Sequence, residues 1–148
     1  MEFEQLRLGN QLCFPVYAAS RLIIREYQPH LDKLGITYPQ YLVLMVLWES
    51  DNLPVNDIAQ KLILNTNTVT PLLKRMEVMG IINRHRSEND ERKVMVQLTT
   101  KGKQMQTEAA SIPEELSASL LSGPLTIEAL IDLKDKLDLI VKFLSKNS

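Results

Sequence analysis

The sequence is poor in features that define several other classes of protein. Its 148 residues include one cysteine, Cys13, so a disulfide within the chain is impossible and a cysteine-based zinc site is not expected. No apolar run approaches the roughly 18–20 residues of a membrane-spanning helix. The N-terminus lacks the basic start and apolar core of a signal peptide. We therefore predict a cytoplasmic protein that does not bind a membrane, with no metal and no cofactor.

The sequence also lacks an excess of charge of either sign. The formal net charge is −1, so the chain as a whole has no attraction for nucleic acid, and any such site must come from local asymmetry. Apolar residues make up 45% and charged residues 24% of the chain, which is typical of a globular protein and excludes global disorder. Without internal repeats or a linker, residues 1–148 are predicted to form a single domain.

Periodic apolar residues predict a mainly helical protein. A long helix is expected over residues 6–34, where Pro15 indicates either a kink or a helix that begins near Phe14. A nearly all-apolar helix follows, capped by Thr37 or Tyr38, and should be central. Residues 51–54 are predicted to be a turn, residues 55–62 a short helix and residues 63–65 another turn.

The helix predicted over residues 65–80 organises the rest of the chain. Asn65 or Thr66 can cap its start, and Gly80 can end it in the left-handed conformation. One face is apolar, and the other begins with short polar side chains that suit base edges and phosphates; these are Thr66, Asn67, Thr68 and Thr70. A solvated helix is the simpler interpretation of that face alone, but two short helices joined by about three residues indicate a helix-turn-helix.

A β-hairpin is predicted directly after this helix, because the apolar period changes to two over residues 81–86 and 93–98. Such a hairpin behind a helix-turn-helix is a wing. Basic residues concentrate here and can bind phosphates; they are Lys74, Arg75, Arg84, Arg86, Arg92 and Lys93. The alternative is a solvated hairpin of mixed charge. We expect Asp90 to orient Arg92 towards a minor groove, unless the pair only stiffens the turn.

The terminal helices are predicted to need a partner. Thr99 or Thr100 should cap a helix that runs to about residue 121 with a bend at 112–113, and Thr126 should cap the last one. The apolar faces of the first and last helices exceed what one winged helix can cover. We therefore predict a mainly α, six-helix winged helix-turn-helix with a small β-hairpin wing, its core at residues 37–99, dimerised through residues 6–36 and 100–146. Such a homodimer should bind a near-palindromic double-stranded operator with half-sites ~34 Å apart.

Several short segments of the sequence resemble those of a known protein family. The wing 86–92 (RSENDER), followed by 98–102 (LTTKG), resembles the MarR family of bacterial dimeric winged-helix regulators. Segments 10–14 (NQLCF), 17–21 (YAASR) and 31–41 (LDKLGITYPQY) are similar to the organic hydroperoxide resistance regulators within it. The resemblance is close over residues 6–102 and extends to the last helices only in pattern. It implies a DNA-binding regulator, by family default a repressor, and not an enzyme.

The resemblance also implies a role for Cys13, which from the residues alone is more simply a small apolar filler. In the similar regulators an organic hydroperoxide oxidises the matching cysteine, and two tyrosines of the other subunit hydrogen-bond its sulfur. Those tyrosines match Tyr27 and Tyr38, and a further one near the site matches Tyr17. The sulfenic acid would proceed to a mixed disulfide with a low-molecular-weight thiol, a sulfenamide or an over-oxidised form, and the repressor would leave DNA.

Three alternatives stay open at this point. A MarR-type regulator can instead sense a small aromatic ligand between the dimer helices and the winged helix, with Cys13 inert. A one-cysteine thiol peroxidase is disfavoured, because both histidines, His30 and His85, lie far from Cys13 in sequence. The third alternative is a winged helix that binds protein and does not touch DNA. DNA binding that does not weaken as salt rises would argue against the phosphate contacts assigned above.

Overall fold

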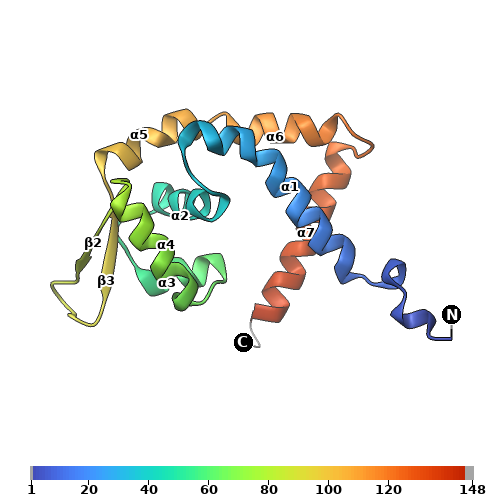
Figure 1. Cartoon of the computed structure of the whole chain (residues 1–148), viewed down its shortest axis with the longest axis horizontal. Coiled ribbons are helices and arrows are strands. Elements are labelled where there is room, and N and C mark those ends of the chain that lie inside the picture. Colours follow the sequence, from blue (N-terminus) through green and yellow to red (C-terminus); the bar gives the residue numbers. More distant parts are fainter. Residues whose placement is uncertain (1, 146–148) are drawn as a thin grey trace.

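A computed structural model describes residues 2–145 and divides into a winged-helix lobe and a set of long terminal helices (Figure 1). Within that range the chain forms two short 3-10 helices, seven α-helices and three strands. Their order is η1 (Glu4–Leu6), η2 (Leu8–Asn10), α1 (Cys13–Leu34), α2 (Tyr38–Glu49), β1 (Leu53–Pro54), α3 (Val55–Leu62), α4 (Thr66–Val78), β2 (Ile82–Arg86), β3 (Val94–Leu98), α5 (Thr100–Ala109), α6 (Ile112–Leu121) and α7 (Ile127–Ser145).

The first long helix begins later than residue 6. The chain forms η1 and η2 first, and α1 begins at Cys13, which agrees with the alternative start near Phe14. Pro15 is therefore the third residue of α1, where a missing N–H costs nothing because the first turn has no acceptor for it. The periodicity over residues 6–12 misled the prediction, since apolar residues recur there without a continuous helix.

Capping explains why the next helices begin where they do. Thr37 Oγ1 accepts from the Gln40 N–H at 3.4 Å, and Gln40 Oε1 accepts from the Thr37 N–H at 3.0 Å, which together form a capping box at the start of α2. As predicted, α2 is central, with Tyr41, Val43, Leu44 and Leu47 buried. The six predicted helices are all present, although the bend expected at 112–113 separates α5 from α6.

The wing is a three-stranded antiparallel sheet rather than a lone hairpin, with strand order β1-β3-β2. Leu53 pairs with Val96 and Pro54 with Met95, so the turn predicted at 51–54 was wrong in its second half. Two residues are too few to reveal a strand period. The missing N–H of Pro54 is tolerated because β1 is an edge strand.

A tight junction joins the end of α4, the wing and α5. Gly80, with φ 76°, reverses the chain, and its carbonyl accepts from Thr99 Oγ1 at 2.7 Å. The Ile81 carbonyl accepts from the Thr99 N–H at 3.1 Å. Trp48 Nε1 of α2 donates to the Gly102 carbonyl at 2.9 Å. These bonds tie the end of α4, the sheet and α2 to the start of α5.

Gly102→Ala is expected to destabilise the fold by about 1–3 kcal/mol through overpacking. A Cβ at this position would lie 2.2 Å from the Ile81 carbonyl oxygen, which is backbone already bonded to Thr99. Urea unfolding followed by circular dichroism measures the change. Gly9→Ala is the matched control, because its Cβ would meet nothing within 4 Å. Equal stability of the two variants would contradict the tight junction.

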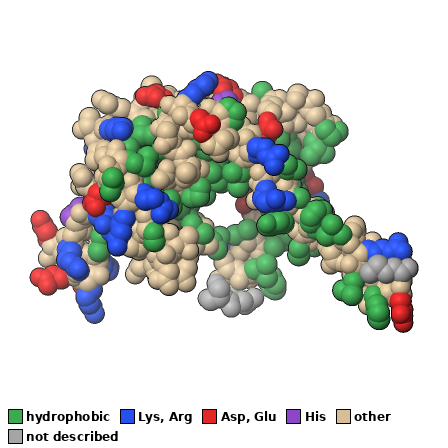
Figure 2. Space-filling view, in the orientation of Figure 1, with side chains coloured by type: hydrophobic (Ala, Val, Ile, Leu, Met, Phe, Trp, Pro, Cys, Tyr) green, Lys and Arg blue, Asp and Glu red, His purple; other side chains and the backbone are tan. Residues whose placement is uncertain are grey.

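The terminal helices leave much apolar surface uncovered. No residue of α7 is buried, and α7 has no extensive contact with any other described element. Its exposed apolar side chains include Ile131, Leu139 and Phe143, and α1 adds Val16 and Leu22. Figure 2 shows hydrophobic side chains over these helices and an open hollow between them and the winged-helix lobe. Within residues 2–145, no helix has the length and apolar character needed to cross a membrane.

Candidate DNA interface and cysteine site

The front of α4 is polar and accessible, as the sequence predicted. Asn65 caps the helix, its Oδ1 accepting from the Asn67 N–H at 2.8 Å. Thr66, Asn67 and Thr68 are exposed, and Thr70 is half-buried. On the opposite face Val69, Leu72, Leu73 and Met76 are buried and anchor the helix in the core. The helix thus presents hydroxyl and amide groups on a rigid support.

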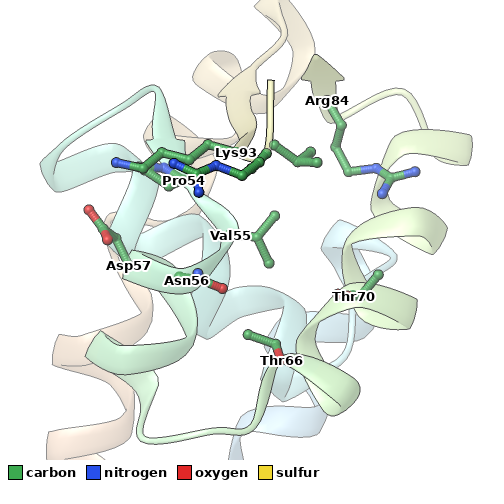
Figure 3. A pocket seen from close by; sticks show the side chains of 10 residues that line it. Pro54, Val55, Asn56, Asp57, Thr66, Thr70, Arg84 and Lys93 are labelled. Atoms are coloured by element: carbon green, nitrogen blue, oxygen red, sulfur yellow. The ribbon is translucent and has the colours of Figure 1, made fainter. Parts of the chain in front are cut away.

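A cavity of about 440 Å³ lies between this front, the start of α3 and the wing (Figure 3). It brings five of the predicted DNA-contacting residues together: Thr66, Thr70, Arg84, Arg92 and Lys93. The other lining residues are Pro54, Val55, Asn56, Asp57 and Val94. The cavity therefore combines three cationic side chains and two hydroxyls with one carboxylate. Lys74 and Arg75 lie apart from it, on the later turns of α4 beside Val78 and Met79.

Asp90 and Arg92 pair at the wing tip. Asp90 Oδ1 accepts from both the N–H and Nε of Arg92, each at 3.1 Å. The side-chain bond from Arg92, and then the backbone bond, hold the pKa of Asp90 below its usual value. The Arg92 side chain is nevertheless 91% exposed. Arg86 Nη1 donates to the Glu91 carbonyl at 2.7 Å and so braces the turn. Lys and Arg side chains gather at this end of the molecule (Figure 2).

Sequence reasoning missed Glu77, which lies on α4 and reaches the wing. Its Oε2 accepts from the Arg84 N–H at 2.9 Å, and its Oε1 accepts from Arg84 Nη2 at 3.3 Å. The only signal in the sequence is an acidic residue between the basic pair of α4 and the basic strand β2. Only the reversal at Gly80 brings the two side chains together.

Cys13 is the first residue of α1 and is exposed. Tyr17 follows one turn later on the same side of the helix, where its side chain is also largely exposed. The Arg21 guanidinium lies 4.7 Å from the centre of the Tyr17 ring. Across residues 2–145, no three His, Cys, Asp or Glu side chains are grouped to hold a metal ion.

Tyr27 and Tyr38 pack together elsewhere, with ring centres 5.0 Å apart and Tyr41 beside them. Burial, and then the neighbouring phenols of Tyr38 and Tyr41, raise the pKa of Tyr27 to about 12. Burial likewise raises the pKa of Tyr38. Both phenols therefore keep their protons at neutral pH and can donate hydrogen bonds. Tyr27 lies about 21 Å from Cys13 along α1, at about 1.5 Å per residue, so these phenols do not reach the Cys13 of their own chain.

Two comparisons of sequence place the chain among transcriptional regulators. Residues 25–109 match the family model described as transcriptional regulator SarA/Rot. The organic hydroperoxide resistance transcriptional regulator of Bacillus subtilis is 50% identical over 112 residues, which cover 76% of each protein.

Solved structures of AbfR from Staphylococcus epidermidis are similar along nearly the whole chain. Reduced AbfR bound to DNA is 37% identical, with a TM-score of 0.80 over 99% of this chain and 98% of AbfR. Over-oxidised AbfR bound to DNA is 41% identical, with a TM-score of 0.75 over 97% and 99%. The disulfide form is 40% identical, with a TM-score of 0.62 over 95% and 97%. The chain therefore belongs to the MarR-type winged-helix regulators and is a homologue of the organic hydroperoxide resistance regulators among them.

Proposed function

We propose that the protein is a sequence-specific DNA-binding repressor that organic hydroperoxides release from DNA by oxidising Cys13. The observation that carries the DNA-binding half is the cavity between α4 and the wing, where Thr66, Thr70, Arg84, Arg92 and Lys93 meet. Hydroxyls on a helix front suit base edges and phosphates, and the cations neutralise the backbone of the same duplex. Residues 37–99 would form the DNA-binding core.

The functional unit in this proposal is a symmetric homodimer. The support is α7, which has no buried residue although its apolar side chains run along its whole length. Pairing the terminal helices of two copies would cover that face and set two recognition helices about one DNA turn, ~34 Å, apart. The dimerisation segments would be residues 6–36 and 100–146; position 146, like the ends of the single domain at 1 and 148, lies outside the described residues.

A dimer would also complete the cysteine site. Cys13 of one copy would lie beside Tyr27 and Tyr38 of the other, whose protonated phenols would hydrogen-bond and stabilise the thiolate. Tyr17, one turn along α1 from Cys13, would close the same site. The AbfR structures support a redox role, because that regulator was observed in reduced, over-oxidised and disulfide forms.

The proposed chemistry is stoichiometric rather than catalytic. The Cys13 thiolate attacks one peroxide oxygen, the O–O bond breaks, and the alkoxide leaves and takes a proton to become an alcohol. A low-molecular-weight thiol then attacks the sulfenic acid, forming a mixed disulfide and releasing water. We assign release to this disulfide, since over-oxidised AbfR is itself bound to DNA. The present fold is nearer to reduced, DNA-bound AbfR than to the disulfide form.

Selection from a random pool of DNA duplexes tests the DNA-binding half. The reduced full chain is expected to enrich a near-palindrome with half-sites about one turn apart, and its affinity should fall steeply as salt rises, because each phosphate contact releases counterions. Fluorescence anisotropy of the enriched duplex measures that affinity. A scrambled duplex of the same composition is the control. A pool without enrichment, or affinity independent of salt, would contradict the proposal.

A further inference from the structure

Glu77 stands out because it is an acidic residue of α4 that pairs with Arg84, one of the cations lining the cavity. It lies on the last turns of α4, and the reversal at Gly80 brings β2 back alongside it. Each carboxylate oxygen accepts one hydrogen bond from Arg84, one from the backbone N–H and one from Nη2. The two side chains are half-buried, with 21% of Arg84 and 36% of Glu77 exposed.

The carboxylate holds one edge of the guanidinium and leaves other donors free. Glu77 engages Nη2, and the side chain of Arg84 makes no other hydrogen bond among the described residues. Arg84 Nε is buried, so the donors left for DNA are those of Nη1 and the second N–H of Nη2. Figure 3 shows the guanidinium on the α4 side of the cavity, above Thr70. Arginine carries five N–H donors in a rigid fork, so a clamped guanidinium can still bind an oxyanion with the remaining ones.

The Glu77 carboxyl group is ionised at neutral pH. The Arg84 N–H, followed by its guanidinium, lowers the pKa of the Glu77 carboxyl, so the carboxylate is ionised throughout the physiological range. A fixed negative charge beside DNA repels phosphates. The contacts show what this charge does within the fold, since both of its oxygens accept hydrogen bonds from Arg84.

We propose that Glu77 is a positioning residue for DNA binding, holding the Arg84 guanidinium in the cavity so that it meets a backbone phosphate beside Thr66 and Thr70. This inference rests on the proposed function. Without Glu77, the Arg84 side chain would lose rotamer freedom on binding DNA. Held by Glu77, it has little rotamer freedom left to lose. The contact between Glu77 and Arg84 also joins α4 to strand β2. The phosphate contact of Arg84 and the polar front of α4 are therefore held at a fixed spacing along the duplex.

Glu77→Gln against Glu88→Gln tests the inference, because the two changes remove the same charge. Glutamine at position 77 can still accept from the Arg84 N–H but no longer pairs with the guanidinium. Glu88 is exposed at the wing tip, and its side chain has no hydrogen-bond or ionic partner within residues 2–145. If only the charge of these residues matters, both variants should bind the selected duplex as well as wild type or more tightly. If Glu77 positions Arg84, the Glu77→Gln variant should bind the duplex about tenfold more weakly than wild type, which is within the range for arginine contacts to DNA. Equal behaviour of the two variants overturns the inference.

A double-mutant cycle separates positioning from support of the backbone. In an Arg84→Ala background the guanidinium is gone but the N–H of residue 84 remains. The effect of Glu77→Gln on affinity should then shrink below about twofold, as expected for a residue that acts only through Arg84. An undiminished effect would assign Glu77 to the backbone of β2 and overturn the inference. Failure of the wild-type chain to select any duplex is a different result, which overturns the proposed function instead.

The Arg84→Lys variant gives a second test of the inference, one that does not depend on whether the Glu77 variant folds. Lysine keeps the charge in the cavity but lacks the planar fork, so it cannot bind carboxylate and phosphate together. The affinity for the selected duplex should fall about tenfold while the slope of log affinity against log salt stays at the wild-type value. Wild-type affinity in Arg84→Lys overturns the inference.

Discussion

Cys13→Ser is expected to keep full affinity for the selected duplex and to lose the response to organic hydroperoxide. The side chain is exposed and lies at the first position of α1, so replacing sulfur with oxygen removes no core packing. A serine hydroxyl does not attack a peroxide. The wild-type chain, treated with cumene hydroperoxide and a small thiol, should lose roughly 5–150-fold in affinity, the usual range of coupling between two sites. Fluorescence anisotropy of the labelled duplex measures both.

Mass spectrometry of the same samples supplies the control. Wild type should gain the mass of the thiol at Cys13, and Cys13→Ser should not. If both proteins release DNA equally, the sensor lies elsewhere, and the small-ligand alternative becomes the better account. If the wild type gains the thiol and keeps its affinity, oxidation of Cys13 is not coupled to the recognition helices.

Arg92→Ala should weaken binding of the selected duplex by roughly 10–100-fold, as expected when an arginine that reaches into DNA is removed. The side chain is 91% exposed, and Asp90 Oδ1 accepts from Arg92 Nε and so orients the guanidinium. Alanine keeps the backbone bond from residue 92 to Asp90, so the turn should survive. Dimer mass and thermal unfolding should therefore match wild type.

Lys103→Ala is the matched control for Arg92→Ala. It removes the same charge from an exposed position on α5, at the opposite side of the lobe from the wing tip (Figure 1). Its affinity should stay within about twofold of wild type, since a distant surface charge is screened by salt. Equal losses in the two variants would reduce the role of Arg92 to net charge alone.

Local signals were enough to predict the helix that carries the interface. Asn65 caps α4 and Gly80 ends it because both effects involve only neighbouring residues. The buried face of Val69, Leu72, Leu73 and Met76 follows from helical periodicity. The Asp90–Arg92 pair was also predictable, since the two residues lie in one short turn.

Features that join distant segments were not predictable from pattern. Strand β1 exists because Leu53 and Pro54 find β3, some forty positions later, and two residues carry no period of their own. The bond between Glu77 and Arg84 depends on how tightly the chain reverses at Gly80.

The junction around Gly102 has a consequence for the speed of the response. Because hydrogen bonds there tie α2, α4, the sheet and α5 together, the winged-helix lobe should move as one piece when the terminal helices shift. Such rigid-body motions take microseconds to milliseconds. The structural rearrangement that follows oxidation of Cys13 would then add no more than milliseconds to the response, whatever the rate of the oxidation itself.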